Sequence, residues 1–115
     1  AHDSHNIAVV GASDADMLAA VLAIQSMGGG LVAVADVQVR ARLPLPVAGL
    51  LLEGCMRDVA EGMEECLAAA AGLGCNLKDP FMTLSFLCLP VIPELKLTDR
   101  GLVDVGRFEL VGMFE

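Results

Sequence analysis

The chain has 115 residues, of which 56% are hydrophobic, with no Trp or Tyr and only four Phe. Its 7 basic and 15 acidic side chains give a net charge of −8, and no Lys/Arg cluster is present, which argues against a nucleic-acid or anionic-membrane partner. The length suits one domain, and the high apolar content indicates either a compact core of small residues or an apolar surface that a partner covers.

The first elements are a strand and a helix. The apolar, β-branched run at residues 6–12 predicts a strand. Ser13 then offers an N-cap and acidic side chains follow it, so we expect a helix over residues 14–27 that stops at the triple glycine beginning with Gly28. This helix is apolar on nearly all sides, which predicts burial on more than one face. Such burial is difficult in 115 residues unless something lies over the helix.

Residues 31–35 and 38–43 predict the two strands of a hairpin that turns near Asp36 and Val37. Asp suits the first central position of a two-residue turn, but Val37 stands where Gly is favoured, so we expect a longer or bulged loop. Pro44 and Pro46 end the second strand because proline has no N–H for a ladder.

Residues 55–72 predict a second, amphipathic helix. Its apolar stripe consists of Val59, Met63, Cys66, Leu67 and Ala70. The side chains predicted to face solvent are Arg57, Asp58, Glu61, Glu64 and Glu65. Glycines at 72 and 74 end the helix.

The last third contains an ambiguous run and two closing strands. Residues 81–92 fit a strand or a buried helix, and periodicity does not decide between them. A turn is predicted at residues 98–101, followed by strands over residues 102–105 and 108–114. The order β-α-β-β-α-β-β predicts an α+β fold, with a mostly antiparallel sheet and about two helices packed on it.

Four cysteines, Cys55, Cys66, Cys75 and Cys88, lack CxxC or any metal-ligand spacing. An even count leaves disulfides open, but no secretory signal precedes them, so we expect free thiols in a reducing cytoplasm. Residues 17–35 carry no charge, yet the glycines interrupt this stretch and leave two pieces too short to cross a bilayer. No transmembrane segment is predicted.

Titratable and polar side chains gather at the start of the chain: His2, Asp3, Ser4, His5 and Asn6. The H-x-x-H spacing would let the two imidazoles converge in a helical turn and diverge in a strand. Nothing at a terminus orients them as metal ligands, so we predict no metal, cofactor or catalytic site formed by this chain alone. A polar run directly before a buried strand instead suggests sequence that continues from something upstream.

Four stretches resemble the carboxy-terminal domain of bacterial adenine deaminase, in the amidohydrolase superfamily. They are AHDSHNIAVVG, MGGGLVAVADVQV, LPLPVAGLL and DPFMTLSFLCLPVIPELKLTDRGLVDV. The resemblance extends over essentially the whole chain, so residues 1–115 are expected to form one such domain. Val37 departs from the glycine usual in this family after the hairpin aspartate.

The resemblance implies a role in purine metabolism, specifically adenine catabolism, in the cytoplasm. A (β/α)₈ barrel in the full-length enzymes holds a two-metal centre of manganese or iron, and it converts adenine and water to hypoxanthine and ammonia. None of the barrel motifs occurs in this sequence. The chain is therefore expected to be enzymatic only as part of a full-length protein and inactive as an isolated fragment.

Two roles for the opening cluster follow from the resemblance. His2, Asp3, Ser4, His5 and Asn6 are expected at the junction with the barrel, where they hydrogen-bond substrate or orient a metal-bound group, or else form a structural interface. The alternative to the deaminase reading is a stand-alone α+β binding or oligomerisation module whose apolar face makes a homo-oligomer.

Overall fold

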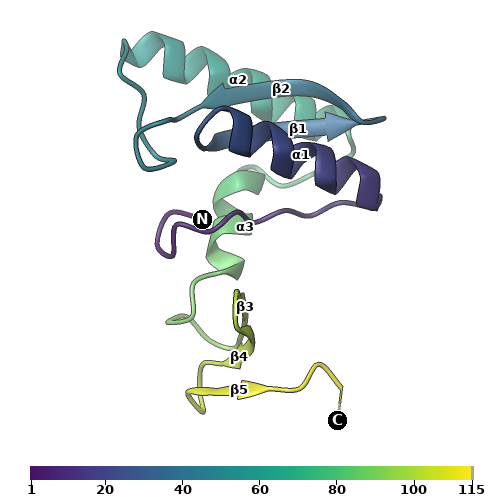
Figure 1. Cartoon of the computed structure of the whole chain (residues 1–115), viewed down its shortest axis with the longest axis vertical. Coiled ribbons are helices and arrows are strands. Elements are labelled where there is room, and N and C mark those ends of the chain that lie inside the picture. Colours follow the sequence, from purple (N-terminus) through teal and green to yellow (C-terminus); the bar gives the residue numbers. More distant parts are fainter. Residues whose placement is uncertain (115) are drawn as a thin grey trace. The chain divides into compact units, whose positions relative to one another are not determined.

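The computed structural model describes residues 1–114 and has an α+β fold, which confirms the predicted class. Its elements in chain order are α1 (Asp14–Ser26), β1 (Gly30–Ala35), β2 (Gln38–Pro44), α2 (Met56–Gly72), α3 (Pro80–Leu87), β3 (Leu95–Thr98), β4 (Gly101–Asp104) and β5 (Glu109–Val111) (Figure 1). The predicted element order is wrong in three places: the first strand is missing, and both α3 and β3 are additional.

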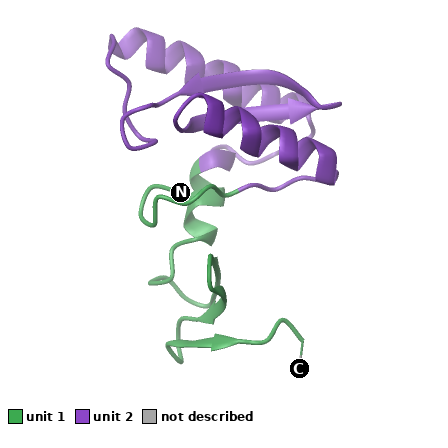
Figure 2. Ribbon diagram, in the orientation of Figure 1, with its two compact units in different colours: residues 1–8, 82–115 green, residues 9–81 purple. Residues whose placement is uncertain are grey.

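The strands form two small antiparallel sheets in place of a single sheet: β1 with β2, and β3, β4 and β5 in that order. The chain divides into two compact units (Figure 2). The larger unit consists of residues 9–81, and the smaller unit consists of residues 1–8 with the described residues from 82 onward. Among residues 1–114, no helix is both long enough and apolar enough to cross a membrane.

Residues 6–12, predicted as a strand, belong to no strand in the structure. The sequence has the right residue types, but a strand also needs a neighbour whose N–H and C=O groups complete its ladder. No strand pairing includes this segment, and Val10 within it is 77% exposed. Local composition therefore predicted an extended conformation without the partner that would make it a strand.

Helix α1 begins and ends where its capping residues predict. The Ser13 hydroxyl accepts a hydrogen bond from the Asp16 N–H at 3.3 Å, and the triple glycine follows the last turn. Gly30 has φ of +130°, and a Cβ built on it would lie 2.0 Å from the Leu43 carbonyl oxygen. Glycine is required there because the backbone of β2 passes too close for any side chain.

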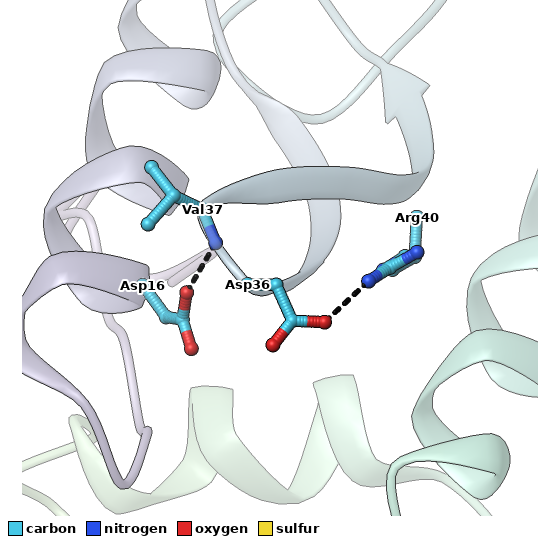
Figure 3. A network of polar contacts seen from close by, with 4 residues as sticks. All are labelled: Asp16, Asp36, Val37 and Arg40. Carbon is cyan, nitrogen blue, oxygen red and sulfur yellow. Dashed lines mark hydrogen bonds and ion pairs between the residues drawn. The ribbon is translucent and has the colours of Figure 1, made fainter.

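The hairpin turn is tighter than predicted. Ala35 pairs with Gln38, so the loop contains only two residues, and the irregularity lies instead between Ala33 and Val34. Asp36 and Val37 both have positive φ, at 55° and 60°, as a type I′ turn requires. The Val37 N–H donates to Asp16 Oδ1 at 2.6 Å, and Asp36 pairs with Arg40 at 2.7 Å (Figure 3). These contacts hold an unfavourable valine in a two-residue turn.

The core of the larger unit lies between α2 and the hairpin. Ala41, Leu43 and Cys66 are buried, and Cys66 has no exposed surface. The partly buried side chains around them are Leu31, Leu45, Val59, Met63, Ala69 and Phe81. Of the predicted stripe of α2, Val59, Met63 and Cys66 belong to this core, whereas Leu67 and Ala70 are only partly buried outside it. The five predicted charged residues are exposed.

Helix α1 is less covered than its composition predicts. Ala20 is its only buried residue, whereas Leu18 and Leu22 are 60% and 54% exposed. Ala15, Leu18, Leu22 and Gln25 are exposed at helical spacing, and we call this set the α1 outer face. Within the described residues an apolar helix face therefore meets solvent, and burial on a second side stays a prediction that depends on something lying over the helix.

The smaller unit contains most of α3 and a three-stranded meander. The ambiguous run at residues 81–92 forms a helix that stops at Leu87. The predicted turn is confirmed: Thr98 pairs with Gly101, and the Thr98 hydroxyl donates to the Gly101 carbonyl at 2.8 Å. The last strand, predicted over residues 108–114, is shorter at both ends: Phe108, with φ of +56°, precedes it, and it stops at Val111.

Candidate functional site

The polar residues at the start of the chain form a compact turn within the smaller unit. Residues 2–5 have turn geometry, and the Ala1 nitrogen lies 2.7 Å from the Asn6 carbonyl oxygen, at the other end of the turn. His5 lies in the left-handed region with φ of +54°, a conformation that histidine tolerates better than most residues. The five residues named by the sequence are thus gathered in one turn, which we call the N-terminal turn.

His2 is held against α3. Its Nδ1 lies 2.6 Å from the Ser85 hydroxyl oxygen, and its main-chain N–H donates to the same oxygen at 3.3 Å. Its ring also meets the Phe86 ring edge-on, with centroids 5.9 Å apart and an interplanar angle of 90°. His2 therefore has a fixed orientation although its side chain is exposed.

The other members of the N-terminal turn present their side chains to solvent. Asp3, Ser4 and His5 are exposed, and Asn6 is half-buried. Nowhere in the part of the chain that the structure describes do three His, Cys, Asp or Glu side chains gather closely enough to hold a metal ion. The chemistry available at this turn is hydrogen bonding by an oriented imidazole, a carboxylate and a hydroxyl.

The four cysteines differ in exposure, and the thiol in the core is unreactive. All four are free thiols, and Cys55 is exposed whereas Cys66 is fully buried. Burial raises the pKa of the Cys66 thiol to about 11, and the neighbouring Glu65 carboxylate contributes in the same direction. A thiol with such a pKa is protonated near neutrality and is a poor nucleophile.

A shallow pocket in the smaller unit is lined by Pro93, Glu94, Leu95, Asp104 and Gly106. Its lining contains two carboxylates but no imidazole, amine, thiol or hydroxyl side chain. The N-terminal turn is therefore the better candidate site, because it alone combines several functional groups with a fixed imidazole.

Sequence reasoning missed Ser85 and Phe86. It treated residues 81–92 only as an ambiguous apolar run, and the partner of His2 is 83 positions away. One signal was available: Ser85 is a hydroxyl within the otherwise apolar LSFL. A polar residue in an apolar helix often has a specific partner.

The three helices and five antiparallel strands described over residues 1–114 define a small α+β protein chain of two units, with a polar N-terminal turn in the smaller one. Residues 1–109 match the sequence profile of the adenine deaminase C-terminal domain. The chain belongs to this family.

Relatives named adenine deaminase match along nearly the whole chain. The protein of Desulfatibacillum aliphaticivorans is 55% identical over 115 residues, which is 100% of this chain and 20% of the relative. That of Methanothrix thermoacetophila is 58% identical over 113 residues, or 98% of this chain and 20% of the relative. That of Dehalococcoides mccartyi strain 195 is 53% identical over 111 residues, or 96% and 19%. The chain thus spans about a fifth of the length of these relatives.

Proposed function

We propose that residues 1–115 serve as the C-terminal domain of an adenine deaminase, a cytoplasmic enzyme of purine metabolism. The whole protein converts adenine and water to hypoxanthine and ammonia. The observation that carries this proposal is the family match over residues 1–109, together with relatives of that name at 53–58% identity. In this proposal the reaction takes place on a catalytic domain supplied by the remaining four-fifths of a relative's length.

The metal expected for this chemistry belongs to that catalytic domain. The described residues do not fit a manganese or iron centre, since no three ligating side chains among residues 1–114 converge. We therefore assign this chain two roles: it covers part of the catalytic domain, and it positions groups at the junction with that domain. Its own residues bind and orient groups at the junction between the domains.

The α1 outer face supports a covering role. A helix at the surface of an independent domain usually presents polar side chains to water, yet this face has two leucines that are more than half exposed. The relatives are about five times longer than this chain, so a large folded surface is available to cover the face. In this proposal the catalytic domain packs against Leu18 and Leu22.

The N-terminal turn supports a place at the domain junction. The side chains of residues 2–5 are exposed, and the contacts of His2 with α3 hold the turn in place. Such a group suits hydrogen bonding to substrate or to the entrance of the catalytic site. A structural interface is the competing role.

Ammonia release from adenine tests the proposed activity. We expect a deaminase-length protein that contains this chain to release ammonia and hypoxanthine in equal amounts, and the 115-residue chain alone to release none. Sustained turnover by the isolated chain would contradict the assignment of a covering role.

Single substitutions in the full-length protein test the junction. We expect His2→Ala, Asp3→Ala and His5→Ala each to reduce kcat/KM, whereas Ser26→Ala, a matched loss of a hydroxyl or polar group in the other unit, leaves it unchanged. If all three variants keep wild-type turnover, metal content and stability, the turn has no part in substrate or metal binding, and a structural interface is the role that is left for it.

Self-association is the second candidate function, and the exposed leucines of α1 are the observation in its favour. If the chain is a stand-alone oligomerisation module, light scattering during gel filtration will give a dimer mass that reverts to a monomer in Leu18→Lys/Leu22→Lys. Glu61→Lys, on the solvated face of α2, is the control for added charge. If the unsubstituted chain, the double leucine variant and Glu61→Lys are all monomers, self-association is excluded.

A further inference from the structure

Ser85 meets His2 at two points through one oxygen atom. The Ser85 Oγ lies 2.6 Å from the His2 ring nitrogen Nδ1 and accepts the His2 main-chain N–H at 3.3 Å. The two residues are 83 positions apart and belong to the same unit. One hydroxyl on α3 therefore fixes both the backbone and the ring of the first histidine in the N-terminal turn.

The hydrogen-bonding capacity of the Ser85 hydroxyl relates this contact to the position of the imidazole proton. A serine oxygen supplies one donor and two lone pairs, so after accepting the main-chain N–H it can either donate to Nδ1 or accept from Nδ1–H. Only the first arrangement uses the hydroxyl proton within the chain, and in it Nδ1 is the acceptor. A neutral imidazole whose Nδ1 accepts must have its proton on Nε2.

The Phe86 ring restricts the remaining motion of the imidazole. The edge-on contact at 5.9 Å and 90° is a favourable aromatic geometry. With Ser85 fixing Nδ1 and Phe86 fixing the ring plane, an exposed histidine has one preferred orientation and one preferred tautomer.

We infer that Ser85 is a positioning residue that holds His2 as the Nε2–H tautomer, so that the exposed imidazole offers a hydrogen-bond donor at the N-terminal turn. The ring orientation follows from the geometry of this chain alone, and the inferred tautomer is the one in which the Ser85 hydroxyl both accepts and donates. The use of that donor at the junction rests on the proposed function, in which the acceptor is supplied by substrate or by the catalytic domain.

Nitrogen NMR of the 115-residue chain tests the inference directly. The chain has only two histidines, so ¹⁵N-histidine labelling gives two imidazoles, and His5→Gln assigns them. At about pH 9, where an ordinary imidazole is neutral, we expect a pyridine-type signal for His2 Nδ1 and a pyrrole-type signal for Nε2. Addition of urea is expected to move both toward the averaged values of an unfolded histidine.

Substitutions at Ser85 separate positioning from a general loss of structure. We expect Ser85→Ala to move the His2 nitrogens toward their unfolded values while amide spectra elsewhere stay the same. Ser85→Thr, which keeps the hydroxyl, restores them, and Ser26→Ala leaves them unchanged. A proton on Nδ1 in the unsubstituted chain, or His2 signals insensitive to Ser85→Ala, would overturn the inference.

Kinetics in the deaminase-length protein test the use of the donor separately. We expect Ser85→Ala and His2→Ala each to lower kcat/KM by about tenfold, with the double variant no worse than His2→Ala and Ser85→Thr close to wild type. Additive losses would contradict action through His2. A confirmed tautomer with unchanged kinetics in His2→Ala would instead overturn the proposed role of the turn and leave the positioning by Ser85 intact.

Discussion

The two units of this molecule obtain their stability in different ways. Five of the six buried residues described lie in the larger unit, where α2 packs on the β1–β2 hairpin around Leu43 and Cys66. The smaller unit has only Val105 buried, and three leucines of its meander are more than half exposed, namely Leu95, Leu97 and Leu110. A short meander without a covered apolar face has little stability of its own. The smaller unit therefore depends more on turns and hydrogen bonds.

The largest expected effect is in the larger unit at Gly30. In Gly30→Ala, the new Cβ would meet the Leu43 carbonyl at 2.0 Å in a backbone with φ of +130°, so the strand must shift. We expect the free energy of unfolding to fall by about 4 kcal/mol, from strain and overpacking together. Urea denaturation measures this. The control is Gly72→Ala, where no atom lies within 4 Å of the added Cβ and little change is expected.

A matched pair of leucine truncations compares the two units directly. Leu43 is 3% exposed and Leu97 is 56% exposed. We expect Leu43→Ala to lower the free energy of unfolding by about 3 kcal/mol through a core cavity, and Leu97→Ala to change it by less than about 1 kcal/mol. Equal effects in denaturation curves of the isolated chain would show that the smaller unit has a core that the burial pattern does not reveal.

Alkaline pH tests the buried thiol of the larger unit. Below about pH 9 both states keep the Cys66 proton. Above that pH the unfolded chain loses the proton and the folded chain keeps it up to a pKa of about 11, so stability falls as the pH rises through this window. We expect a loss of about 2 kcal/mol across it.

Denaturation curves of Cys66→Ala provide the reference for that measurement. Truncation of the side chain lowers stability at every pH, but it should remove the part of the pH dependence that comes from the thiol. The same slope between pH 9 and 11 in both proteins would mean that other groups cause the loss.

The smallest expected effect is at the hairpin turn. Val37 has φ of +60°, which a β-branched residue adopts at a cost, and its side chain is 60% exposed, so Val37→Gly removes strain without emptying a core. We expect a gain of about 0.5–1 kcal/mol, measured as a higher urea midpoint. Val39→Gly, at the second residue of β2, should destabilise instead, because glycine loses more conformational freedom in a strand than valine does.

Features that depend on neighbouring residues were predicted correctly, whereas features that depend on distant contacts were not. Ser13, the triple glycine and the apolar stripe of α2 act within a few residues, so their elements were predicted within one or two positions. The predicted strand at residues 6–12 was wrong because a strand depends on a partner elsewhere in the chain. The contact of His2 with Ser85 was missed for the same reason, since it closes a loop of 83 residues.

The hairpin shows how tertiary contacts override local preference. Sequence rules argued against a two-residue turn with valine in it, yet Asp16, 21 residues away, accepts the Val37 N–H. The bond offsets part of the cost of the left-handed valine. Turn preference is therefore a weak guide where another element supplies an acceptor.

The hydrogen-exchange rate of the Val105 amide measures how often the smaller unit opens locally. The Val105 side chain is 6% exposed, and the Val105 amide, directly after β4, donates to the Glu94 carbonyl at 2.9 Å, so deuterium replaces that proton only when this hydrogen bond opens. Its exchange rate reports one local event, without interference from the better-packed α2 and hairpin. If the Val105 amide exchanges more slowly in a deaminase-length protein than in this chain, the ratio of the two rates measures the protection that a covering domain supplies.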